Sequence, residues 1–174
     1  LYPAYRIWDV NEIWNKMCKA SQKVISKINH ADILGVTVTT FGVDGTLFDK
    51  DGRMLYPVIS WQCERTKQVM ADIDKYIALE DLYKENGVLP FNFNTINKLI
   101  WFKENRPELI GKSFRFLFMP SIFSYFLTGE MVNDTTMAGT SMMTSLASRQ
   151  FSENIFRRTG CRRPARPARH ASPG

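Results

Sequence analysis

The stretch Ile33-Leu-Gly-Val-Thr-Val-Thr-Thr40 is short, rich in β-branched residues and apolar on one face. This pattern predicts a buried β-strand. Apolar residues recur at helical spacing over 10–28, and Asp9 with Glu12 forms a capping-box-like start, so we expect an amphipathic helix of about 19 residues that ends near Asn29-His30. A helix followed by a buried strand, with further helices and strands after it, indicates an α/β domain.

Turn residues and apolar spacing divide the rest of the chain. Lys50-Asp51-Gly52 predicts a hairpin turn between two strands. Gly87, Gly129 and Gly160 each follow a helical stretch and are the expected stop signals. The expected strands are 46–49, 54–60 and 114–118, and the expected helices are 64–77, 79–86, 95–105, 120–127 and 152–159.

The composition excludes several classes of protein. The chain has 174 residues, of which 44% are hydrophobic and 23% charged, as in an ordinary globular protein. The longest apolar stretch, 114–127, contains Arg115 and Pro120, which excludes a membrane-spanning helix there. No secretory signal pattern follows Leu1, and we expect a cytoplasmic protein with reduced thiols at its widely spaced cysteines. These cysteines are Cys18, Cys63 and Cys161.

The net charge of +6 comes from the end of the chain. Six of the 23 basic residues are arginines after residue 156, where no acidic residue occurs. The 17 basic and 17 acidic residues of 1–156 balance, so a domain-wide surface for nucleic acid has no support. We interpret 1–160 as the folded part and 161–174, which is rich in Arg, Pro and Ala, as a disordered tail. A translated frameshift or read-through is our preferred explanation of the tail, and a natural linker or an Arg-rich arm for nucleic acid or anionic lipid are the alternatives.

The segment Thr40-Phe41-Gly42-Val43-Asp44-Gly45 follows the expected buried strand. Glycines at a strand end often mark the close approach of a ligand or of another backbone. Asp44 is therefore a candidate contact for a sugar hydroxyl, and Trp61 a candidate platform for a sugar face. The alternatives are a bulge with a hydrogen-bonded Asp and an ordinary core Trp. The sequence contains no spaced set of metal ligands and no Gly-rich nucleotide loop, so chemistry alone names no catalytic group.

Three segments, in order, resemble the FGGY family of carbohydrate kinases. Phe93-Asn-Thr-Ile-Asn-Lys98-Leu-Ile-Trp101-Phe-Lys-Glu-Asn105 fits a signature of this family at every constrained position. Ile59-Ser-Trp61-Gln-Cys-Glu-Arg65-Thr66 resembles the family's Trp and Arg-Thr segment. Leu127-Thr-Gly-Glu130, followed by Asp134-Thr-Thr-Met-Ala-Gly-Thr-Ser141, resembles the stretch that closes its sugar-binding domain. The resemblance runs from about residue 8 to 160.

The resemblance implies a partial actin-like, ribonuclease H-like ATPase fold: the N-terminal, sugar-binding domain of such a kinase without its first strands. It implies transfer of the γ-phosphoryl group of ATP, with Mg²⁺, to the 1-hydroxyl of a small ketose, and neither a nucleic-acid nor a membrane partner. The residues of 38–45, 56–61 and 136–141 are most similar to the corresponding residues of kinases that act on L-fuculose. Kinases of L-rhamnulose, and a sugar-binding module without catalysis, are the alternatives.

The resemblance also implies a set of substrate-binding residues. Gly42, Trp61 and Phe93 match sugar-contacting positions, and Asp44 and Asn94 are polar candidates beside them. The family's phosphate loop and its catalytic Asp, which follows a Gly-His pair, have no counterpart in 1–174, so we expect this chain alone to be inactive. We interpret Lys98 as structural, paired with a carboxylate. A strand over 33–40 without its usual neighbours would expose an edge that favours association between chains.

Overall fold

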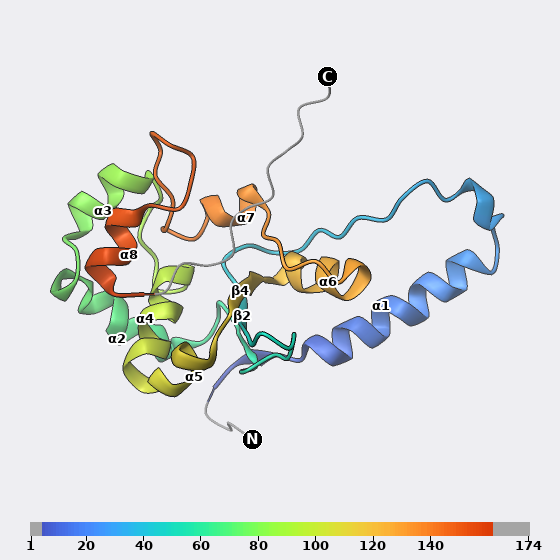
Figure 1. Cartoon of the computed structure of the whole chain (residues 1–174), viewed down its shortest axis with the longest axis horizontal. Coiled ribbons are helices and arrows are strands. Elements are labelled where there is room, and N and C mark those ends of the chain that lie inside the picture. The colour runs from blue at the N-terminus through green and yellow to red at the C-terminus, as the bar shows by residue number, and fades with distance from the viewer. Residues whose placement is uncertain (1–4, 162–174) are drawn as a thin grey trace.

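The computed structural model describes residues 5–161 and contains short strands surrounded by helices (Figure 1). Short 3₁₀ turns lie at His30–Asp32, Glu64–Thr66 and Ile73–Lys75. The strands and helices are β1 Ile7–Trp8, α1 Val10–Ile25, β2 Gly45–Phe48, β3 Val58–Ile59, α2 Lys67–Ala71, α3 Leu79–Asn86, α4 Thr95–Asn105, α5 Pro107–Lys112, β4 Arg115–Phe118, α6 Met119–Thr128, α7 Thr135–Gly139 and α8 Glu153–Thr159.

The described chain has two regions, which we call the arm and the body. The arm is residues 10–41, that is α1 and the long connection after it, and Figure 1 shows it extending away from the rest. The body is residues 5–9 together with residues 42–161. The first turns of α1 attach the arm to α6, where the Trp14 ring lies 6.1 Å from that of Phe123 and 5.4 Å from that of Phe126. Beyond these turns the side chains of α1 become progressively more exposed.

Two antiparallel strand pairs form the sheet structure of the described residues. β2 pairs with β4 in a register that places Gly45 opposite Phe118, and β1 pairs with β3. Glycine is required at the start of β2, because a Cβ on Gly45 would lie 2.3 Å from the Leu117 carbonyl oxygen. All four residues of β2 are buried, so this pair forms the centre of the body.

Helix α4 runs through the body core. Its first eight residues, Thr95 to Phe102, are all buried. A helix that is covered on every side belongs to a core and not to a surface. The Phe102 ring makes an edge-on contact with Tyr56 at 5.2 Å, and Trp101 lies 6.0 Å from the same ring. The expected helices 79–86 and 95–105 are confirmed with their predicted bounds.

The predicted strand over 33–40 is wrong for the described residues. Residues 33–41 form no strand, and within 5–161 no hydrogen bond between two backbone groups involves the amides or carbonyls of 34–41. The side chain of Leu34 is 99% exposed and that of Val36 is 73% exposed. The residue types are those of a strand, but a strand requires a neighbouring strand to receive its hydrogen bonds. No described strand pairs with this segment, and Val38 contacts the body only by side-chain packing.

Other differences from the expected elements are local. The expected helix 64–77 is divided into two 3₁₀ turns and α2, with a break at Asp72, a residue type that competes for backbone hydrogen bonds inside helices. The expected strand 54–60 keeps only β3, although a single bridge joins Phe48 to Met54 and preserves the hairpin. The sequence did not predict β1, α5 or α7.

The predicted helix stops and the end of the predicted folded part fall within the described residues. Gly87, Gly129 and Gly160 have the positive φ angles expected of helix stops. Cys161, which we placed at the start of the tail, is buried in the body core. Residues 162–174, the rest of that predicted tail, lie outside the described residues. Within 5–161, no helix has the length and apolar character that a bilayer crossing requires.

Candidate sugar-binding site

Three of the predicted site residues meet in one pocket. Gly42 lies just before β2, Trp61 follows β3, and Phe93 precedes α4, yet all three line a pocket of about 330 Å³. The Trp61 and Phe93 rings are 6.2 Å apart and nearly perpendicular. The remaining lining residues are Phe41, Val43 and Thr140.

The backbone beside the pocket is strained at Val43. Its φ is +62°, a left-handed conformation that a β-branched residue rarely adopts. The Asp44 amide donates to the Gly42 carbonyl at 2.8 Å, which closes a γ-turn of the positive-φ kind. Such strain costs of the order of 1–3 kcal/mol and persists only where neighbouring contacts enforce it.

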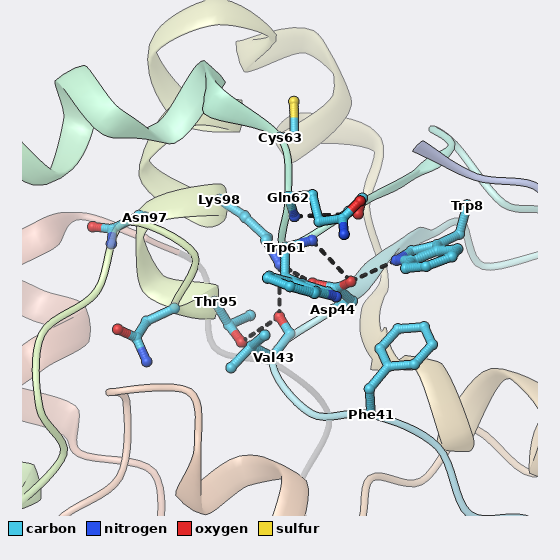
Figure 2. Close-up of polar contacts among 12 residues, drawn as sticks. Trp8, Phe41, Val43, Asp44, Trp61, Gln62, Cys63, Thr95, Asn97 and Lys98 are labelled. Atoms are coloured by element: carbon cyan, nitrogen blue, oxygen red, sulfur yellow. Dashed lines mark hydrogen bonds and ion pairs between the residues drawn. The ribbon is translucent and has the colours of Figure 1, made fainter. Parts of the chain in front are cut away.

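Helix α4 supplies those contacts. The Thr95 hydroxyl donates to the Val43 carbonyl at 2.8 Å, and the Lys98 ammonium donates to the same oxygen at 3.1 Å. Figure 2 shows both bonds converging on Val43. The signature stretch therefore acts on the pocket through the γ-turn, in addition to contributing Phe93.

Asp44 lies behind the pocket wall and is fully buried. One carboxylate oxygen, Oδ2, accepts from the Trp8 indole nitrogen at 2.6 Å and from the Trp61 amide at 3.0 Å. The other, Oδ1, pairs with Lys98 (Figure 2). Protein groups thus engage both oxygens, and the carboxylate joins the γ-turn, β1 and the Trp61 segment into one unit.

The carboxylate partner that we expected for Lys98 is Asp44. The side chains of this ion pair are 1% and 0% exposed. Burial lowers the pKa of Lys98, and the adjacent Asp44 carboxylate opposes that effect. A buried pair of this kind is strongly destabilising to break, because the remaining charge has no water to solvate it. Lys98 therefore holds the wall in place and does not line the pocket.

Asn94 is also behind the wall. Its Oδ1 accepts from the Phe91 amide at 2.6 Å, and its Nδ2 donates to the Thr140 carbonyl at 3.1 Å. Asn94 and Asp44 were predicted as substrate contacts, but neither belongs to the pocket lining. Their geometry supports a role in positioning Phe93, Thr140 and Trp61, which do line it.

Sequence reasoning missed several residues of the site. Phe41 and Val43 flank Gly42 and belong to the lining, but their apolar side chains resemble those of any strand end. Thr140 comes from the end of α7, a helix that was not expected. Trp8 supplies a donor to Asp44 from β1, and its ring packs on Phe41 with centroids 4.8 Å apart. Phe41, the aromatic residue directly before the Gly-Val-Asp-Gly turn, was the available sequence signal for this part of the lining.

Cys63 lies two residues after Trp61 and is buried. Burial by itself raises the pKa of its thiol, but hydrogen bonds from Arg65 outweigh that effect and hold the pKa below its ordinary value. The Arg65 Nε lies 3.1 Å from the sulfur. This contact fixes the chain after Trp61. Among residues 5–161 no group of three His, Cys, Asp or Glu side chains is arranged to hold a metal ion.

The chain matches the model of the N-terminal domain of the FGGY family of carbohydrate kinases over residues 2–170. The chain belongs to the FGGY family. L-fuculokinases of Haemophilus influenzae and Escherichia coli K12 are 41% and 43% identical over 90% and 88% of the chain. A rhamnulokinase of Oceanobacillus iheyensis is 27% identical over 90% of it. The chain spans about a third of the length of these relatives, so it corresponds to part of an FGGY kinase.

Solved structures confirm the α/β fold of the actin-like ATPase class. A xylulose kinase from Rhodospirillum rubrum superimposes with a TM-score of 0.85 at 19% identity, covering 95% of this chain and 35% of that one. A ligand-bound xylulose kinase from Lactobacillus acidophilus gives 0.84 at 18% identity, covering 93% and 34%. At this identity the likeness concerns the fold alone. Here it extends over the arm as well as the body.

Proposed function

We propose that the chain forms one wall of the sugar site in a kinase that phosphorylates O1 of L-fuculose. The observation that carries this proposal is the convergence of Gly42, Trp61 and Phe93 on one pocket in an FGGY domain. Aromatic rings in a concave site commonly pack against the apolar face of a sugar. The identity to L-fuculokinases, 41–43%, supports L-fuculose over L-rhamnulose, whose kinases are 27–28% identical.

The proposed reaction uses ATP and Mg²⁺ as cofactors of the whole kinase. Among residues 5–161 no group of three His, Cys, Asp or Glu side chains is arranged to hold a metal ion, and we assign no Mg²⁺ ligand to them. We therefore assign no step of phosphoryl transfer to this chain, and we expect it to bind sugar without consuming ATP. Its contribution to the reaction is positioning, which matters because phosphoryl transfer depends on aligned reactants.

Ligand-detected NMR on the 174-residue chain tests this function. We expect binding of L-fuculose, weaker binding of its C4 epimer L-rhamnulose, and no ADP production with ATP and Mg²⁺. Trp61→Ala should weaken L-fuculose binding by roughly 10-fold, because it removes an aromatic wall of the pocket. Tyr83→Ala, at a half-exposed ring on α3 away from the pocket lining, is the matched control and should leave binding unchanged.

Each other outcome changes the interpretation. Preferred binding of L-rhamnulose would favour the alternative hypothesis that the chain belongs to a kinase of L-rhamnulose. Sugar-dependent ADP production by this chain would contradict the proposal that it binds sugar without consuming ATP. No binding of any ketose would contradict the sugar-binding function itself, including the alternative of a sugar-binding module without catalysis.

A further inference from the structure

We propose that Phe41, Val43, Trp61 and Phe93 form a subsite for the C6 methyl group of a 6-deoxyketose. This inference rests on the proposed function and adds the residues that would distinguish such a sugar from its 6-hydroxylated counterpart. Its basis is the polarity of the lining: three aromatic rings, one valine side chain, a glycine and Thr140.

Intramolecular bonds already engage most polar groups of this lining. The Thr140 hydroxyl donates to the Met137 carbonyl at 2.9 Å. The Gly42 carbonyl accepts from the Asp44 amide, and the Trp61 amide donates to the Asp44 carboxylate. The indole N–H of Trp61 remains as a donor for one sugar hydroxyl. A second hydroxyl packed against these rings would find no matching partner among them and would lose part of its water, since Phe41 is 37% and Trp61 43% exposed.

The chemistry of the ketose determines which part can enter such a pocket. Every carbon of a hexulose carries oxygen, except C6 of a 6-deoxy sugar. Burying a methyl group is favourable by about 0.8 kcal/mol, whereas burying an unpaired hydroxyl costs about 1–3 kcal/mol. An apolar pocket discriminates between two ligands that differ by one such group by roughly 10- to 100-fold. Stacking of a ring face on Trp61 or Phe93 alone would produce no preference at C6.

Val43 is the position at which this idea is tested most directly. The γ-turn fixes its backbone, and α4 holds its carbonyl through Thr95 and Lys98. The side chain is therefore part of a rigid wall. Val43→Thr replaces a methyl group by a hydroxyl of similar size and keeps the β-branch, so it changes the polarity of the wall with little change of shape.

The experiment compares L-fuculose with L-tagatose, which differs from it only by a hydroxyl on C6. Dissociation constants are measured by ligand-detected NMR on the 174-residue chain. We expect the wild type to bind L-fuculose at least about 10-fold more tightly. Val43→Thr should reduce this ratio several-fold. Val24→Thr, at a 57% exposed position on α1, is the matched control and should leave the ratio unchanged.

The outcomes separate this inference from the proposed function. Equal affinity of the wild type for the two sugars would overturn the methyl subsite and leave sugar binding intact. If a folded Val43→Thr chain keeps the wild-type ratio of affinities for the two sugars, the methyl group does not bind against the wall that contains Val43. If no ketose binds, both the subsite and the proposed function fail. Thermal unfolding of the variant shows whether it is folded, and Phe41→Tyr provides the same test from another lining residue if it is not.

Discussion

The connection 33–41 in the arm and strand β2 in the body have similar residue types but different structures. Each is rich in small, apolar and β-branched residues. β2 is buried at all four positions and paired with β4, whereas 33–41 is extended over the surface with Leu34 almost fully exposed. The difference shows that residue type gives a segment the capacity to be a strand, and a neighbour decides whether it becomes one.

The charged pairs of the two regions differ in the same way. In the body, Lys98 and Asp44 form a buried pair with hydrogen bonds to the surrounding backbone. In the arm, Lys16 and Glu12 form a pair one helical turn apart, at 73% and 61% exposure. The first pair is tied to the pocket wall, and water screens the second.

Hydrogen exchange should show the largest contrast between the regions. We expect the amides of 34–41 to exchange at least about 1,000-fold faster than those of β2 and β4, because the described structure gives them no hydrogen-bond acceptor. Amide-resolved exchange measured by NMR checks this. Protection of 34–41 that increases with protein concentration would instead indicate that the arm pairs with a second copy of the chain.

Removal of one charge from each ion pair gives the next largest effect. Lys98→Met leaves the Asp44 carboxylate buried without its cation, and we expect a loss of about 3–5 kcal/mol in the free energy of unfolding. Lys16→Met, the matched change in the arm, should cost less than about 1 kcal/mol. Urea unfolding monitored by Trp fluorescence measures both. Similar costs would mean that the buried pair is not what holds the body together.

The pH dependence of stability should depend on Cys161 in the body. Burial raises the pKa of its thiol from 9.0 to about 11. The unfolded chain therefore loses this proton more readily than the folded chain. The contribution of the protonated thiol to the free energy of unfolding is complete below pH 9 and is lost as the pH rises toward 11. We expect a loss of roughly 2 kcal/mol over that interval relative to Cys161→Ala. If the free energy of unfolding depends on pH in the same way in the wild type and in Cys161→Ala, the thiol of Cys161 is not buried.

The helix caps provide the smallest test. Asp9 caps α1 by accepting from the Glu12 amide at 2.9 Å, and Asp134 caps α7 in the body by accepting from the amides of Thr136 and Met137. Each should contribute about 1 kcal/mol. Asp9→Ala should speed exchange only within α1, whereas Asp134→Ala should lower the unfolding midpoint of the body. A shift of that midpoint by Asp9→Ala would show that the two regions unfold together.

Local signals in the sequence predicted much of the body. Helix α3 follows from its stop at Gly87, and α4 follows from its end before Pro107. The pairing of Lys98 with a carboxylate was expected as a structural role within the family signature. Three of the five predicted site residues line the pocket. The γ-turn at Val43 and the contribution of Trp8 could not be predicted, because both depend on contacts between distant segments. The strand expected over 33–40 was wrong for the same reason, since nothing within a segment indicates whether a neighbour is present.

The contact between Lys98 and Asp44 joins residues 54 positions apart, and β2 pairs with β4 over a still longer separation. While the chain is being synthesised, the Asp44 carboxylate therefore stays in water until α4 has left the ribosome. The backbone beside this wall is completed only when β4 pairs with β2, and the pocket lining only when Thr140 has followed. The complete binding surface is thus a late product of translation.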